Sequence, residues 1–242
     1  MSSKTCVAAL VAILGCASEA QAQVFYTESP RSGALRLKLG KYDPRPAIDS
    51  ESGLTGKPFE ETFGRSPLWL FELEYEHYLW QGFGAFGGGL SAGYAEKYGA
   101  ATVTADPGQT TSEKTAFQVF PLRLYALYNF DYAASRWRIP LVPYVKGGVG
   151  YVLWRITKGG QVEVVEGRRG QGGKWALGGA AGVAFLLDVL EPRLAADFDS
   201  DVGINHSYLF GEYNVLRTDL LFGGGGLNLS SHQLMFGLAF EF

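Results

Sequence analysis

Cysteine is almost absent from this chain of 242 residues, since Cys6 and Cys16 are its only two and both lie near the N-terminus. Beyond that region no uninterrupted apolar run approaches the roughly 20 residues that a membrane-spanning helix needs. The net charge of −3 offers no basic footprint for nucleic acid, and the three histidines stand apart from one another. These absences exclude an α-helical membrane protein, and they predict neither a nucleic-acid partner nor a metal site.

The N-terminus has the features of a secretory signal. Lys4 precedes a short apolar stretch over residues 6–15, and Ala20-Gln21-Ala22 follows it. A positive charge, an apolar region too short to span a bilayer and an Ala-x-Ala end are typical of a cleaved signal peptide. We predict that residues 1–22 are removed, with Ala20 and Ala22 forming the cleavage site. The mature chain 23–242 would then have no disulfide and no thiol nucleophile.

The same region permits a second interpretation. Ile13-Leu14-Gly15-Cys16 is close to a lipobox, which would leave a lipidated Cys16 at the new N-terminus. Leu14 is an imperfect fit to that motif, and the Ala-x-Ala end explains the region without lipid. We therefore favour the secretory signal and keep the lipoprotein as the alternative.

Glycine and aromatic residues are abundant, and 33 glycines with 14% aromatic side chains favour strands and turns over helices. In the last ten residues, Leu234, Phe236, Leu238, Phe240 and Phe242 alternate with Met235, Gly237, Ala239 and Glu241. This period of two places the large apolar residues on one face of a strand. A terminal strand that closes a barrel in lipid has a reason to end on two such rings, whereas a fraying terminus in water does not.

The end of the chain also resembles a known recognition signal. Gly237, Phe240 and Phe242 match the pattern by which the outer-membrane assembly machinery recognises the last strand of its barrel substrates. That signal usually has a polar residue two places before the glycine, where this chain has Met235. The resemblance implies the barrel-assembly machinery as a partner.

Period-two alternation recurs along the chain and predicts eight strands. They span Gly33–Tyr42, Leu68–Trp80, Phe83–Tyr98, Phe117–Asp131, Leu141–Thr157, Lys174–Asp188, Gly203–Val215 and Gln233–Phe242. Long and short connections alternate between them, as an up-and-down transmembrane barrel requires. Residues 191–201 are compatible with a short helix or with a strand. Pro121 and Pro143 fall inside strands, so we expect a bulge or a strand start at each.

Alternation alone does not distinguish a membrane barrel from a soluble lipocalin-like carrier with its apolar face turned inward. Three features favour the membrane barrel. The polar faces carry charges of both signs, which we expect to form a network in the lumen: Arg36, Lys38, Glu72, Glu74, Glu76, Arg123, Lys146 and Glu241. Glycines opposite them leave room in a narrow interior. Aromatic residues gather near the strand ends, as in interfacial girdles: Tyr42, Trp69, Trp80, Tyr98, Tyr132, Trp137, Trp154, Trp175 and Tyr213.

The chain as a whole resembles the small eight-stranded outer-membrane barrels. Its segments Gly203–Tyr213 and Gly237–Phe242 are similar to an outer-membrane barrel family of myxobacteria, and the similarity covers nearly all of the mature sequence. No activity is assigned to that family, so the resemblance implies a fold and a location but no catalytic residues.

An enzyme that modifies lipid A is the main alternative function. Barrel enzymes of that kind place a His-x-Ser pair on one face of a strand. Here Tyr208 stands two residues after His206, and the adjacent Ser207 points to the opposite face. Neither His77 nor His232 repeats the motif.

The sequence therefore predicts an all-β protein, an eight-stranded antiparallel up-and-down barrel in the outer membrane. Its polar lumen is filled, so we expect no open pore. We expect a structural or binding role with no catalysis, cofactor or metal. The expected partners are the lipid bilayer and the assembly machinery, and the sequence names no surface ligand.

Overall fold

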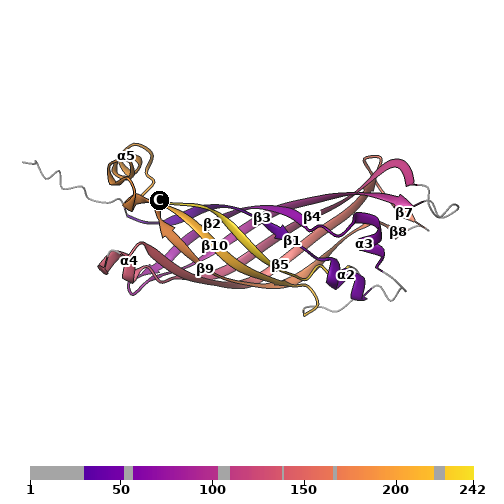
Figure 1. Cartoon of the computed structure of the whole chain (residues 1–242). Helices are drawn as coiled ribbons and strands as arrows, with labels where there is room; N and C mark the ends of the chain where they lie inside the picture. The colour runs from indigo at the N-terminus through magenta and orange to yellow at the C-terminus, as the bar shows by residue number, and fades with distance from the viewer. Residues whose placement is uncertain (1–29, 52–56, 103–109, 138, 166–167, 221–226) are drawn as a thin grey trace, which may run out of the picture.

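The computed structural model describes residues 30–51, 57–102, 110–137, 139–165, 168–220 and 227–242. Eight long antiparallel strands follow one another around a closed barrel (Figure 1). They are β1 (Gly33–Tyr42), β2 (Leu68–Gln81), β3 (Ala85–Thr102), β4 (Thr110–Asn129), β5 (Leu141–Lys158), β9 (Gln171–Leu186), β10 (His206–Arg217) and β11 (Ser231–Glu241). Pairing of β4 with β5 and of β1 with β11 closes the ring. The predicted fold class is confirmed, whereas Ala20, Ala22 and Cys16 lie outside the described residues.

Smaller elements occupy the connections. They are α2 (Arg45–Glu51), α3 (Pro58–Phe63), α4 (Tyr132–Trp137), β6 (Gln161–Val162), β7 (Val164–Val165), β8 (Arg168–Arg169), η1 (Leu187–Val189) and α5 (Pro192–Val202). The ambiguous segment 191–201 is thus helical. Gly203 ends α5 in the left-handed conformation, with φ of 75°, so β10 begins at His206 rather than at the predicted Gly203. No described helix is long and apolar enough to cross a membrane.

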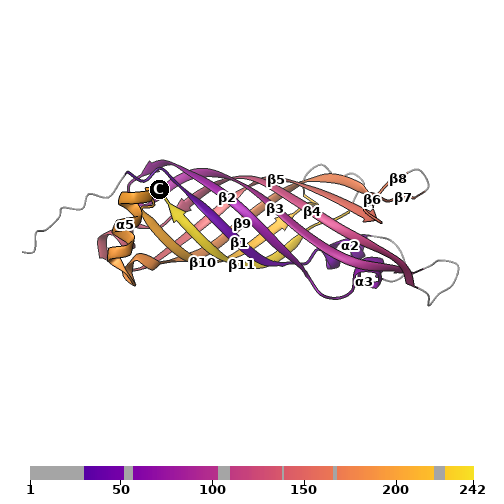
Figure 2. The ribbon, with the colours of Figure 1, turned by 90° about the horizontal axis from the view of Figure 1, so that it is seen from above.

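The connections divide between the two ends of the barrel. The end with α2, α3 and β6–β8 is here called the loop end, and the end with the C-terminus, α4 and α5 is called the terminal end (Figures 1 and 2). The wall is uneven, because β4 has 20 residues while β1 has 10. Helices α2 and α3 lie at the loop end, and α3 contacts the tall strand β3.

The prolines behave differently from each other. Pro143 is the third residue of β5, close to a strand start as predicted. Pro121 lies inside β4 without a bulge: Ala92 pairs with Leu122 and Ala95 with Val119, so the register is the same on both sides. Around the proline, the β3–β4 ladder lacks the two pairs between them, which accommodates the missing N–H of the proline.

Glycines make room for large side chains inside the narrow barrel. A Cβ at Gly148 would lie 2.1 Å from the Leu124 carbonyl oxygen and 2.8 Å from the Tyr125 Cβ. A Cβ at Gly237 would lie 1.9 Å from the Leu37 carbonyl oxygen and 2.9 Å from the Phe210 ring. Only glycine fits at these two positions, as an eight-stranded lumen that is just wide enough for side chains requires.

Candidate functional site

The middle of the barrel interior holds four carboxylates and four cations. We call this set the central ion network: Glu72, Glu74 and Glu76 from β2, Glu212 from β10, Arg36 and Lys38 from β1, Arg123 from β4 and Lys146 from β5. All eight side chains point inward and are buried or nearly so. The formal charges of this set sum to zero.

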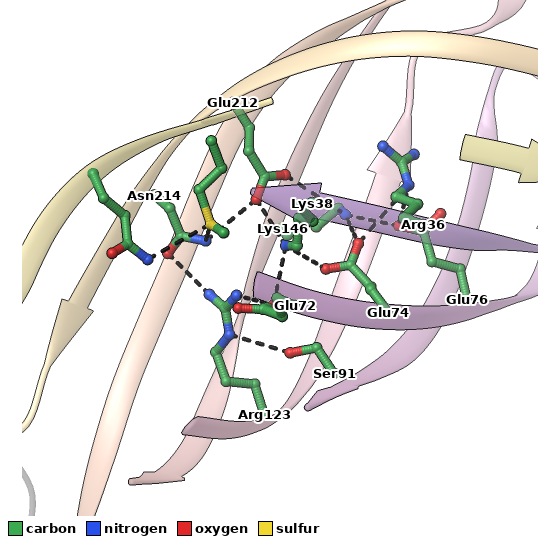
Figure 3. Close-up of polar contacts among 12 residues, drawn as sticks. Arg36, Lys38, Glu72, Glu74, Glu76, Ser91, Arg123, Lys146, Glu212 and Asn214 are labelled. Carbon is green, nitrogen blue, oxygen red and sulfur yellow. Dashed lines mark hydrogen bonds and ion pairs between the residues drawn. The ribbon is translucent and has the colours of Figure 1, made fainter. Parts of the chain in front are cut away.

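The register of β1 with β2 brings opposite charges together. Lys38 pairs with Glu72 and Arg36 with Glu74 across the ladder, so their side chains are cross-strand neighbours. Lys38 Nζ lies 3.1 Å from Glu72 Oε1 and 2.5 Å from Glu74 Oε2. Its third carboxylate is Glu212 on β10, two strands away around the barrel, at 2.8 Å (Figure 3).

Two further cations reach the same carboxylates from β4 and β5. Lys146 forms ion pairs with Glu74 and with Glu76, the latter at 2.8 Å. Arg123 forms a hydrogen-bonded ion pair with Glu72 and donates to Asn214 Oδ1 at 2.9 Å. Figure 3 shows these side chains converging in the lumen, so the network joins strands β1, β2, β4, β5 and β10 across the interior.

Arg36 lies at the terminal side of the network. Its Nε is 2.9 Å from Glu76 Oε1, and its guanidinium lies over the rings of Tyr144, at 4.4 Å, and Phe210, at 5.0 Å. Cation–π contacts of this kind are strongest where the cation is removed from water.

Glu241 lies apart from the central ion network, although we expected it there. Its position opposite Ala34 of β1 follows the predicted closure of the barrel. However, its carboxylate accepts hydrogen bonds from Arg31, at 3.4 Å, and from the Tyr208 hydroxyl, at 2.7 Å. Arg31 also pairs with Asp131 at 2.8 Å, so a second, smaller cluster lies at the terminal end.

The structure brings together the other seven predicted residues and adds Glu212 and Asn214, which sequence reasoning missed. Both face inward from β10, where Phe210, Glu212 and Asn214 alternate with Leu209, Gly211 and Tyr213. The polar alternate positions of that strand were the available signal. The partner across the barrel could not be read from sequence, because it depends on the curvature of the wall.

Little free space remains around the network. A cavity lined by Lys38, Glu74, Arg123 and Lys146 has a volume of about 20 Å³, and another beside Arg36 has the same volume. Each has room for about one water molecule.

Towards the loop end the interior becomes apolar. A cluster of buried side chains fills it, here called the loop-end core: Tyr42, Ile48, Phe59, Phe63, Leu68, Leu70, Ala95, Phe117, Val119, Val152, Ala176, Leu216, Leu229 and Met235. Ile48 comes from α2 and Phe59 and Phe63 from α3, so these helices plug the mouth of the barrel. The rings of Phe59 and Phe117 meet edge to face, with centroids 5.0 Å apart.

The outer surface around the central ion network is apolar. Large side chains stand outward there with 41–62% of their surface exposed: Leu73, Leu124, Val149, Leu209, Phe236 and Leu238. On β5 every outward residue from Leu141 to Leu153 is uncharged. Twelve residue steps at about 3.3 Å, tilted by about 40°, span roughly 30 Å along the barrel axis. That height matches the hydrocarbon core of a bilayer, about 30 Å.

Polar side chains replace the outward apolar ones at the level of the loop-end core. Six outward residues on successive strands are direct partners across the ladders and form a row: Lys41, Trp69, Glu96, Gln118, Arg155 and Gln171. Gln118 donates to Glu96 Oε1 at 2.5 Å, and Arg155 donates to Gln118. Lys41 Nζ lies 5.6 Å from the centre of the Trp69 ring. We call this set the boundary row.

The predicted aromatic girdles need two corrections. Trp69, Trp80, Tyr98, Trp137, Trp175 and Tyr213 are exposed on the outside. Tyr42 instead points inward and donates its hydroxyl to the Leu229 carbonyl at 2.7 Å. Trp154 also packs against the loop-end core. Both belong to strand segments beyond the apolar belt, where the inward face is the apolar one.

No family model matches the sequence, and no curated protein matches it. Among solved structures, the neisserial surface protein A is similar, with 12% identity and a TM-score of 0.47, covering 89% of this chain and 99% of that chain. OprG from Pseudomonas aeruginosa shares 12% identity with a TM-score of 0.48, over 90% of this chain and 98% of its own. Ail of Yersinia pestis shares 11% identity with a TM-score of 0.39, over 89% and 100%. Likenesses this distant carry no inference about function, and the fold rests on the strand pairings above.

The histidine that could suggest catalysis has an acidic partner. His206 Nδ1 lies 2.6 Å from Asp188 Oδ2, and the Ser207 backbone N–H donates to Asp188 Oδ1 at 3.1 Å. A histidine held by a carboxylate is half of a nucleophile-activating arrangement. The Ser207 side chain cannot complete it, because neighbouring residues of β10 point to opposite faces.

The proposed assembly signal lies where the barrel closes. Phe242 accepts hydrogen bonds through its carbonyl from the backbone N–H groups of Ser32, at 2.6 Å, and Gly33, at 3.0 Å, and its own N–H donates to Gly33. Phe240 faces outward. Gly237 has the packing requirement against Leu37 and Phe210 described above, which applies whether or not the residue is part of a signal.

Proposed function

We propose that this chain is an outer-membrane β-barrel whose role is structural or ligand-binding and not catalytic. The barrel would anchor a closed external surface, built from α2, α3 and the tall strands β3–β5, at the loop end. The terminal end would face the periplasm.

The inversion of side-chain polarity along the strands carries this proposal. Around the central ion network charges point inward and apolar groups outward, which suits a lipid surround. Around the loop-end core the apolar groups point inward and polar groups outward, which suits water. On β5 the change comes at Arg155, just beyond an outward apolar run whose length matches the thickness of a bilayer core.

A soluble lipocalin-like carrier fits these observations poorly. Such a carrier would bury Phe236 and Leu238 and expose Glu72 and Glu74, whereas the first two are 62% and 41% exposed and the last two at most 1%. It would also need an interior cavity the size of a ligand, and the cavities beside the network hold about 20 Å³ each.

For the central ion network we propose a structural role. Buried ions are tolerated when each has partners of opposite charge, and loss of one partner is costly. The buried charges of the network sum to zero and lie inside the apolar outer surface, so none of them contacts lipid. It also fills the lumen, so the proposed function includes no open pore.

The predicted leader, with Ala20 and Ala22, and the similarity to a myxobacterial barrel family remain part of the proposal. Both are consistent with export to an outer membrane. Recognition of the C-terminal strand by the assembly machinery, through Gly237, Phe240 and Phe242, is also consistent with export to an outer membrane.

Cell fractionation tests the location. We expect the protein in the outer-membrane fraction, with migration on gels that changes after boiling, as for a folded barrel. Recovery in the periplasm after mild lysis would refute the proposal. Lipid mass should be unchanged in cells that overproduce the protein, and a change in lipid A mass would instead favour the enzyme alternative.

The assembly signal can be separated from barrel closure at Phe242. Deleting the residue removes both its ring and its backbone bonds to Ser32 and Gly33, whereas Phe242→Ala removes only the ring. If the assembly machinery recognises the ring, Phe242→Ala lowers the amount of protein in the outer membrane but still refolds in detergent. Leu238→Ala, which removes another outward side chain of β11, does not lower that amount. A normal amount of the Phe242→Ala variant in the outer membrane would show that the ring is not recognised.

A further inference from the structure

Helix α5 lies beside the terminal end of the barrel. Figure 1 shows the helix nearly end-on and outside the barrel wall, and Figure 2 shows it crossing the direction of the barrel axis. The helix contacts η1 and β10. A helix that runs across the barrel axis lies along the plane of any membrane that the barrel crosses.

Three faces of α5 have different surroundings. Asp199 is 4% exposed and marks the face that packs on the protein. Leu194, Phe198 and Val202 lie four residues apart, hence on one face, and are 49%, 39% and 65% exposed. The third face carries the polar side chains of Arg193, Asp197 and Ser200, and Asp201, seven residues after Leu194, lies at the border of the second face. We call the second face the apolar stripe.

Other exposed apolar residues lie at the same end of the barrel. Leu190, just before the helix, is 69% exposed. Large outward side chains lie at the strand ends and turns of the terminal end: Leu79, Trp80, Phe83, Trp137 and Ile139. Exposed apolar residues gathered at one end of a protein favour a contact with a membrane or another protein. Helix α5 contacts β10, whose outward Leu209 belongs to the apolar surface around the central ion network.

The two ends of α5 fix it relative to the barrel. Pro192 begins the helix, and Gly203 in the left-handed conformation ends it through hydrogen bonds to the Asp199 and Phe198 carbonyls. Two residues later, the Asn205 N–H donates to the Glu241 carbonyl at 2.7 Å, which ties this segment to the closing strand. The orientation of the helix therefore follows that of the barrel.

We propose that α5 is an interfacial helix, embedded in the periplasmic leaflet with its apolar stripe against the acyl chains. The proposal rests on the proposed function, because it needs the barrel to sit in a bilayer. Interfacial helices usually bury their apolar face about 5–10 Å into the head-group boundary. Most carry basic residues on the polar face, whereas α5 has Asp197 and Asp201 against Arg193. Zwitterionic phospholipid is therefore the fitting surface, and anionic lipid should not strengthen the contact.

Site-directed spin labelling of the full chain in zwitterionic phospholipid vesicles tests this. With Cys6→Ser and Cys16→Ser as background, single labels enter through Leu194→Cys and Phe198→Cys on the apolar stripe. Ser200→Cys is the matched control on the polar face of the same helix, and Phe236→Cys on β11 reports the barrel wall. Accessibility to oxygen and to a water-soluble nickel chelate gives the depth of each label, and the gel shift on boiling confirms that each variant is folded.

The expected result is a label depth of about 5–10 Å at Leu194 and Phe198, with Ser200 open to the chelate and Phe236 buried in lipid. Chelate-accessible labels at Leu194 and Phe198, with Phe236 still in lipid, would overturn the helix proposal and leave the barrel proposal standing. Labels shielded from both reagents would overturn it in favour of a protein or a second copy covering the stripe. If Phe236 were also open to the chelate, both proposals would fall.

Discussion

Two regions of the same strands follow opposite rules. In β4, Arg123 faces inward near the middle of the barrel while Leu122 and Leu124 face out. A few residues nearer the loop end, Phe117 and Val119 face inward and Gln118 faces out. Strand β5 repeats the change, with Lys146 inside between the outward Val145 and Gly147 and with Val152 inside near the outward Arg155. The backbone pairing continues through both regions without a register shift.

The difference shows that pleat geometry and polarity are set independently. The period of two decides only that neighbours point to opposite sides. Which side is apolar depends on what surrounds the wall at that height, lipid or water. A barrel that projects beyond a bilayer must therefore exchange its inward and outward residue types where it emerges. The boundary row marks that exchange on six strands.

Removal of one carboxylate should break the middle region most severely. Glu74→Ala leaves Lys38 and Lys146 with buried charge that Glu74 had neutralised, and loss of one partner from a buried pair typically costs about 3–5 kcal/mol. We expect a free energy of unfolding lower by that amount, measured by urea denaturation in detergent, or a failure to assemble. Gln118→Ala on the boundary row is the control, and an equal loss for the two variants would contradict the distinction.

A charge on the outer surface tests the proposed height of the bilayer. Leu238→Arg lies within the apolar belt and should lower the free energy of unfolding in lipid by about 2–4 kcal/mol, as arginine does near a bilayer midplane. Gln171→Arg on the boundary row should cost about 0–1 kcal/mol, as at an interface. Similar costs at the two sites, measured by denaturation from vesicles, would place the boundary elsewhere.

The sequence predicted the middle region better than the loop end. Alternation and matched charges identified Arg36, Lys38 and Glu72 as inward residues, because their partners lie on adjacent strands of the chain. Tyr42 and Trp154 were assigned to outer girdles, since nothing local indicates that the apolar face turns inward there. Glu212 was missed because its partners reach it across the lumen, and contacts of that kind require the closed ring.

A small change in helix α2 tests whether the loop-end core is packed as tightly as the core of a water-soluble protein. Ile48→Val removes one methyl group from α2 inside the loop-end core, where Ile48 is 5% exposed. Ile→Val in a packed core usually costs about 0.5–1.5 kcal/mol. We expect that loss in the free energy of unfolding, together with faster hydrogen exchange in α2 and α3. An unchanged exchange rate would mean that α2 does not contribute to the core.

The smallest expected effect is the pH dependence of hydrogen exchange in helix α2. Arg45 donates to both Asp43 oxygens at 2.6 Å, and this hydrogen bonding lowers the pKa of Asp43 from its usual value of 3.8. A carboxyl with a lowered folded-state pKa stabilises the fold above the unfolded value, and that contribution is lost as pH falls through the folded-state pKa. Exposure to solvent weakens the pair, so the effect should be local.

At neutral pH, Asp43→Asn should speed hydrogen exchange over 45–51, after correction for intrinsic rates. In strong acid the variant and the natural chain should exchange at the same rate. At neutral pH the backbone amides around the central ion network, which is remote from this loop, should stay protected in both proteins.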